Sequence, residues 1–108
     1  MIIATTPTLE GYKITEYRGV GTAQAIMGAN IGRDFLAGLT DIFGGRSGQY
    51  EGKIEEASNT ALEELKVKAK AKGANAIVGI DFDFGTVGSS ESMMLCVVSG
   101  TFVMVEKQ

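Results

Sequence analysis

Several residue types that carry common chemistry are missing or nearly missing from this sequence of 108 residues. It contains no histidine and one cysteine. The absence of histidine removes the side chain used most often in general acid–base catalysis, and with it the Ser-His-Asp and Cys-His arrangements. A single cysteine excludes an intrachain disulfide. Tight zinc or copper sites usually need imidazoles or several thiolates, and one chain does not supply that set.

Long hydrophobic runs and basic patches are also missing. The longest mostly apolar stretch, residues 93–105, is shorter than the roughly 18 residues that a membrane helix needs. The first seven residues lack the positive flank and cleavage site of a signal peptide. The net charge is −3, without a basic run that would fit nucleic acid or an anionic membrane. We therefore expect a cytoplasmic protein that binds neither nucleic acid nor a membrane.

What is present indicates one globular domain over residues 1–108. The sequence is 44% hydrophobic and 21% charged, as in ordinary globular proteins. Glycine is over-represented, with 15 residues in 108, against a usual share of about 7%. Because there is only one proline, these glycines indicate turns, helix caps and close backbone approaches rather than a disordered linker.

The clearest predicted element is a helix over residues 49–72. Its apolar residues recur at three- and four-residue steps and form one stripe, which Leu62 widens. The stripe consists of Tyr50, Ile54, Ala57, Ala61, Leu65 and Ala69. Acidic residues fill the first half and lysines the last two turns, as the helix dipole favours, and Gly73 is placed to end the helix.

A shorter helix is predicted over residues 31–43, where apolar residues again follow the helical period. Asn30 is placed to cap its start. Gly32 and Gly38 weaken its propensity by up to about 1 kcal/mol each. We therefore expect packing, within the subunit or between subunits, to hold this helix.

Four strands are predicted around the long helix. Residues 2–5 form a short edge strand before Pro7, and residues 12–26 form a longer strand in which Gly19 and Gly21 indicate a bulge or a close backbone approach. Residues 76–84 and 93–105 form the last two strands, joined by a polar hairpin loop over 85–92. The last strand is apolar on both faces, which indicates burial by another subunit. These elements predict an α+β fold with one long helix on an antiparallel sheet.

Asp81 and Asp83 are the first candidate site. They lie on the same face of a predicted strand, with Cβ atoms roughly 6–7 Å apart, while Ile80, Phe82 and Phe84 face the other way. Such a pair suits acid–base chemistry or a hard cation such as Mg²⁺. Residues 81–85 begin like an EF-hand loop, but Gly85 stands where a third ligand is needed. The favoured interpretation is the polar, solvent-facing side of a half-buried strand.

Sulfur atoms on the last strand form the second candidate site. Met94, Cys96 and Met104 share one strand face, and soft metal ligands are one use of such an arrangement. The same residue types are ordinary core fillers, and Cys96 shares its face with Val98 and Phe102. Core packing is therefore the favoured interpretation, and no metal site is assigned.

The third candidate is an anion site at Gly45, Arg46 and Ser47, which lead directly into the long helix. Free backbone N–H groups, the positive end of the helix dipole and the guanidinium of Arg46 are suited to a small anionic ligand. The P-loop spacing is absent, and a turn between two helices, capped by Ser47 or Gly48, is the plainer alternative. No cofactor-binding fingerprint is found, since residues 19–21 lack the glycine expected at position 24.

Several segments resemble the YbjQ-like family in the expected order along nearly the whole chain. The central motif is carried by residues 25–31 (Ala-Ile-Met-Gly-Ala-Asn-Ile), 33–34 (Arg-Asp), 41–47 (Asp-Ile-Phe-Gly-Gly-Arg-Ser) and 50–51 (Tyr-Glu). The C-terminal motifs are carried by residues 73–81 (Gly-Ala-Asn-Ala-Ile-Val-Gly-Ile-Asp) and 98–101 (Val-Ser-Gly-Thr). The resemblance implies a small two-layer β-α-β-β sandwich of dodecin-like subunit architecture, assembled as a homopentamer. It brings no catalytic residues, and some members are labelled "putative heavy-metal-binding".

Three functions follow from these observations. We favour a non-enzymatic, homo-oligomeric binding or scaffold protein. A metal-binding protein is the alternative, although the absence of histidine and the single cysteine argue against it. A small hydrolase that uses Asp81 and Asp83 is the third.

Overall fold

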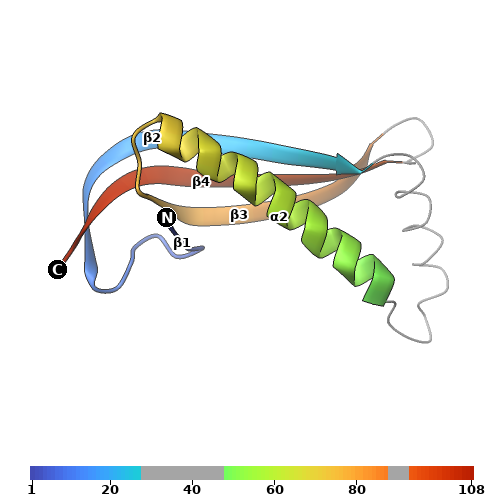
Figure 1. The fold of residues 1–108 in the computed structure, drawn as a ribbon, viewed down its shortest axis with the longest axis horizontal. Helices are drawn as coiled ribbons and strands as arrows, with labels where there is room; N and C mark the ends of the chain where they lie inside the picture. Colours follow the sequence, from blue (N-terminus) through green and yellow to red (C-terminus); the bar gives the residue numbers. More distant parts are fainter. Residues whose placement is uncertain (28–47, 88–92) are drawn as a thin grey trace.

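The computed structural model describes residues 1–27, 48–87 and 93–108 (Figure 1). Along the chain, its elements are β1 (Ile2–Ile3), β2 (Tyr12–Met27), α2 (Gly48–Ala71), β3 (Ala76–Val87) and β4 (Met93–Lys107). The helix predicted over residues 31–43 and the anion site at Gly45, Arg46 and Ser47 lie outside the described residues. No helix within these ranges is long and apolar enough to cross a membrane.

The strands form one four-stranded sheet in the order β1-β3-β4-β2. β4 pairs antiparallel with both β2 and β3, whereas β1 pairs parallel with β3. The prediction of an antiparallel sheet is therefore wrong at this edge, and the sheet is mixed. The reason is the path of the N-terminal segment, which runs beside β3 in the same direction. Ala4 N donates to Ile77 O at 2.9 Å, and Ile80 N donates to Ala4 O at 3.1 Å.

Helix α2 crosses one face of the sheet diagonally (Figure 1). Its predicted stripe is the buried side from Ala57 onward, and Leu65 is among the largest fully buried side chains of the described residues. The helix ends as expected at Gly73, whose φ of 79° is strained for residues with a Cβ atom. Gly73 N donates to Lys70 O at 2.9 Å and Ala74 N to Ala69 O at 3.0 Å, the hydrogen bonds of a Schellman motif.

Two glycines of the sheet leave room for buried side chains. A Cβ atom on Gly100 would lie 2.6 Å from Cγ2 of Ile77 and 3.6 Å from Cδ2 of Leu65. A Cβ atom on Gly21 would overlap the ring of Phe102, which fills that space. Of the two alternatives predicted for Gly19 and Gly21, the close approach at Gly21 is to a side chain and not to a backbone. A register shift of β2 against β4 also falls between Tyr17 and Gly19.

The opposite face of the sheet is partly covered by the N-terminal segment. Val103 and Val105 of β4 are buried there against Leu9 and Tyr12. This contact accounts for the burial of Val103 and Val105 on the second apolar face of β4 without a second subunit. The sequence prediction assigned that burial to another subunit, and it is wrong for this end of the strand.

The last two strands run longer than predicted. β3 continues through Gly85 to Val87, because residues 85–87 pair with residues 93–95 of β4. The hairpin loop was predicted to begin at Gly85, and the cross-strand ladder overrides the poor strand propensity of this glycine. β4 continues to Lys107, where Lys107 pairs with Tyr12.

Candidate functional site

The part of the sheet that neither α2 nor the N-terminal segment buries forms an open face. It lies at the Met27 end of β2, where side chains alternate between the helix and the other side. The open face consists of Val20, Thr22, Gln24 and Ile26 of β2, Leu95, Val97, Ser99 and Thr101 of β4, and Asp81 and Asp83 of β3. Its apolar members on the outer strand are strongly exposed, at 81% for Val20 and 55% for Ile26.

Residues of the open face lie in rows across the three strands. Ser99 pairs with Thr22 on one side and with Asp81 on the other. Val97 pairs in the same way with Gln24 and Asp83. The two carboxylates therefore project on the same side of the sheet as the hydroxyl and amide groups of β2, with one strand between them.

Asp81 and Asp83 are both exposed and interact with each other. A hydrogen bond with Asp83 raises the pKa of Asp81 above its ordinary value, and the negative charge of Asp83 and slight desolvation act in the same direction. The prediction that both face away from Ile80 and Phe82 is confirmed, since those two side chains pack with the core under α2. Two adjacent oxygen donors are present, and the described residues bring no third acidic, cysteine or histidine side chain to them.

Cys96 and Met94 lie in the core beneath α2. Burial raises the pKa of the Cys96 thiol, and the neighbouring Ser58 hydroxyl acts in the opposite direction. Met104 lies ten residues from Met94 on the same strand, or about 33 Å at the usual rise per residue. The three sulfur atoms therefore form no common site within one chain, and the core interpretation is confirmed for Met94 and Cys96.

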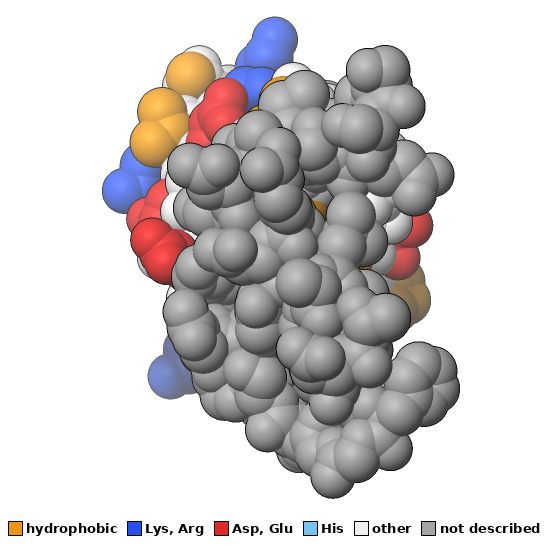
Figure 2. All heavy atoms as spheres, turned by 90° about the vertical axis from the view of Figure 1, so that its right-hand side faces the viewer, with side chains coloured by type: hydrophobic (Ala, Val, Ile, Leu, Met, Phe, Trp, Pro, Cys, Tyr) orange, Lys and Arg blue, Asp and Glu red, His pale blue; other side chains and the backbone are white. Residues whose placement is uncertain are grey.

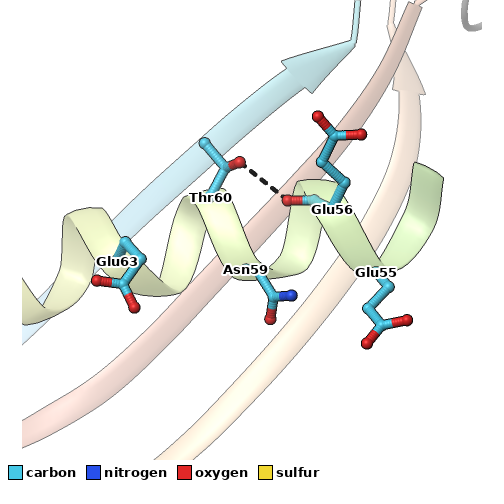
Figure 3. Close-up of a pocket in the computed structure, with 5 residues that line it drawn as sticks. All are labelled: Glu55, Glu56, Asn59, Thr60 and Glu63. Atoms are coloured by element: carbon cyan, nitrogen blue, oxygen red, sulfur yellow. Dashed lines mark hydrogen bonds between the residues drawn. The ribbon is translucent and has the colours of Figure 1, made fainter. Parts of the chain in front are cut away.

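A hollow on the outer surface of α2 was missed as a site by the sequence interpretation. Its lining residues are Glu55, Glu56, Asn59, Thr60 and Glu63. Figure 3 shows Glu55 and Asn59 on one side of the helix and Glu56 with Thr60 on the other, where Thr60 Oγ1 donates to Glu56 O at 2.9 Å. The carboxylates do not converge, so this hollow is the solvated acidic face of the helix. The acidic residues in the first half of the helix were its sequence signal.

A second hollow lies beside β3, between α2 and the N-terminal segment. Its volume is about 210 Å³, and its lining residues are Ile3, Ala4, Thr5, Leu62, Ile80 and Phe82. The lining is mostly apolar and offers no ionisable group. Sequence patterns gave only an indirect signal, the position of Leu62 at the margin of the helical stripe.

The described surface carries charges of both signs, and along α2 the acidic residues precede the lysines. Figure 2 shows acidic, basic and hydrophobic side chains intermixed at the margins of the view. On α2 and β2 several charges are paired locally, with Lys66 Nζ 3.0 Å from Glu63 Oε1 and Arg18 3.0 Å from Glu16.

Comparison with known proteins agrees with the motifs and the fold. A family model described as "Putative heavy-metal-binding" matches residues 1–106. The chain belongs to the YbjQ-like family. A crystal structure of a protein of unknown function from Pediococcus pentosaceus, assigned to the DUF74 family, is similar to this YbjQ-like chain with a TM-score of 0.62. The similarity covers 98% of both chains at 16% sequence identity, so it supports the fold and not an activity.

The family description raises the question of whether the YbjQ-like chain has donors for a heavy metal. Its only cysteine is fully buried and it has no histidine. Within the described ranges no three acidic or cysteine side chains are grouped so that they could hold a metal ion. Carboxylate oxygens prefer hard cations, whereas heavy metals favour thiolates and imidazoles. The described residues of one chain do not fit a heavy-metal site.

Proposed function

We propose that this YbjQ-like protein is a non-enzymatic, homo-oligomeric binding or scaffold protein. The observation that carries the proposal is the open face, where exposed Val20 and Ile26 flank polar residues on an outer strand of the sheet. Burying apolar surface is favourable by about 25 cal/mol per Å². Contact with further copies would remove these side chains from water.

The pattern of β4 supports the same proposal. Leu95 and Val97 face the open side and are half-buried, although the adjoining Val103 and Val105 are covered by the N-terminal segment. Apolar residues thus continue along this strand beyond the part that the described chain covers. The family likeness favours a ring of five copies, and we propose that this ring works in the cytoplasm.

The absence of enzymatic activity is proposed from the chemistry of the side chains. The sequence has no histidine, and its one thiol is buried with a raised pKa. A nucleophilic thiol is usually accessible and has a lowered pKa. Asp81 and Asp83 lie on an exposed sheet face rather than in a cleft that excludes water.

We propose further that any small ligand is anionic and binds near Arg46.

Light scattering coupled to size-exclusion chromatography tests the oligomer directly. The expected mass is about five times the 11.4 kDa of one chain, and it should persist over a micromolar range of protein concentration. A mass near that of one chain throughout this range would overturn the proposal.

Metal binding is the second candidate, because the family description names it and Asp81 and Asp83 form a pair of oxygen donors. Elemental mass spectrometry of purified, tag-free protein separates the two. The scaffold proposal expects far less than one zinc, copper or cadmium per chain. A stoichiometric metal that survives dialysis would favour the second candidate, and its loss in Cys96→Ser or in Asp81→Asn would identify the donor.

A further inference from the structure

We infer that neighbouring copies join edge to edge, with β2 of one copy beside β3 of the next. In this arrangement Thr22 and Gln24 of the first copy face Asp81 and Asp83 of the second. The inference rests on the proposed homo-oligomer and names the surface through which it assembles.

The two strands concerned lie at the two sides of the sheet. β2 is the outer strand along its whole 16 residues. On the other side, β1 and the residues after it cover β3 only as far as Ile80, which donates to Ala4 O. Within the described chain, β3 from Asp81 to Val87 is therefore a second open edge. Alternate backbone N–H and C=O groups of such an edge point outward and need partners.

The far half of β2 carries little of the usual protection against pairing within its own sequence, although Lys68 Nζ of α2 donates to Thr22 O at 2.7 Å. Residues 19–27 contain no charged residue and no proline, whereas residues 12–18 carry Lys13, Glu16 and Arg18. Natural edge strands that must stay single are blocked by charges, prolines or bulges. The register shifts of β2 also fall before Gly19, so the segment beyond it is regular. This uncharged, regular half is long enough to pair with all seven residues of Asp81–Val87.

Strand directions and levels match for pairing between copies. β2 and β3 are both antiparallel to β4, so they run in the same direction. Because Ser99 pairs with both Thr22 and Asp81, these two residues lie at one level of the sheet, as do Gln24 and Asp83. Rotation about an axis along the strands then brings β2 of one copy beside β3 of the next in a parallel, head-to-tail contact. Contacts of this type close into a ring when the rotation from copy to copy completes a full turn.

The side chains of the two edges are chemically complementary. Asp81 and Asp83 are crowded acceptors, which the raised pKa of Asp81 reflects. Thr22 offers a hydroxyl donor and Gln24 an amide donor on the same face. Neighbouring strands lie about 4.8 Å apart, close enough for hydrogen bonds between side chains in one row. Both edges belong to this chain, so a second copy is the occupant we assign to each.

Two double variants of β2 test the contact, because they change charge in opposite directions. Thr22→Asp with Gln24→Asp places carboxylates beside Asp81 and Asp83, and we expect the oligomer to dissociate at least about 10-fold more readily. Thr22→Lys with Gln24→Lys places cations there, and we expect the assembly to be retained or tightened in a salt-dependent way. Adding Asp81→Lys and Asp83→Lys to the aspartate variant should restore the assembly.

The control is Val67→Asp, on the exposed side of α2, where Val67 is 66% exposed. It adds a charge at an exposed apolar position of the helix rather than on either strand edge, and it should leave the mass unchanged. Circular dichroism should show that every variant is folded. If the wild type is an oligomer and the aspartate and lysine variants keep or lose it equally, the edge contact is wrong while the proposed function stands. If the wild type is a monomer, the proposed function itself is overturned.

Discussion

The side-chain amide of Asn75 is paired with the backbone of Val105 through two hydrogen bonds. Asn75 Nδ2 donates to Val105 O at 3.0 Å, and Val105 N donates to Asn75 Oδ1 at 2.8 Å. The backbone ladder between β3 and β4 begins at Ala76 and Val103. Asn75 therefore extends the ladder by one more pair with its side chain and fixes the start of β3 against the end of β4.

Asn75→Ala should lower the free energy of unfolding by about 1–3 kcal/mol, because it removes both hydrogen bonds and leaves the backbone of Val105 to water. Urea denaturation at a fixed protein concentration measures the change. Asn59→Ala is the matched control, since Asn59 is exposed on α2 and alanine is a good helix former. Equal stability of the two variants would show that the amide pair contributes nothing.

Gly100→Ala should be destabilising by about 1–3 kcal/mol, because its methyl group would lie 2.6 Å from Cγ2 of the fully buried Ile77. Gly21→Ala should behave in the same way against the ring of Phe102. Gly85→Ala is the control, with nothing within 4 Å of the added atom and no positive φ. If all three substitutions have the same effect on the urea midpoint, close packing at Gly100 and Gly21 is not the cause.

Cys96 should react with a thiol reagent at least ~10-fold more slowly in the native protein than in guanidinium at pH 8. The thiol is buried and its pKa is raised in the folded state. Because the folded pKa lies above the unfolded one, this group supports folding below the unfolded pKa of about 8.5 and that support is lost as the pH rises. Native reactivity equal to that of the unfolded chain would contradict the placement of Cys96 in the core.

The carboxyl group of Asp81 should titrate at a lower pH in Asp83→Asn than in the wild type. The substitution removes the charge of Asp83 and changes the hydrogen bond that favours the protonated form of Asp81. In the wild type the raised pKa means that Asp81 supports folding most at low pH, and that this support is lost as the pH rises through the folded pKa. An NMR titration that follows the carboxyl carbon shift of Asp81 in both proteins measures the two midpoints. Identical midpoints would show that the two groups do not interact.

Local sequence patterns determined several elements of this protein. The apolar residues that recur every four residues from Ala57 to Ala69 predicted both the long helix and its buried side. Helical periodicity depends only on residues that lie a turn apart. Gly73 marked the end of that helix, since its left-handed conformation strains residues with a Cβ atom. The alternation of Asp81 and Asp83 with Phe82 predicted which side chains share the open face, because successive residues of a strand point to opposite sides.

The tertiary structure alone decided how these elements meet. The parallel pairing of β1, the cover that Leu9 provides for Val103, and the extension of β3 through Gly85 all depend on partners that are distant in the sequence. Composition and periodicity describe which faces are apolar, but they do not specify which segment covers them. The rows that place Thr22 and Asp81 on either side of Ser99 arise in the same way. Strand order and register result from the packing of the whole sheet, because each strand can pair with several others until the helix and the N-terminal segment take their places.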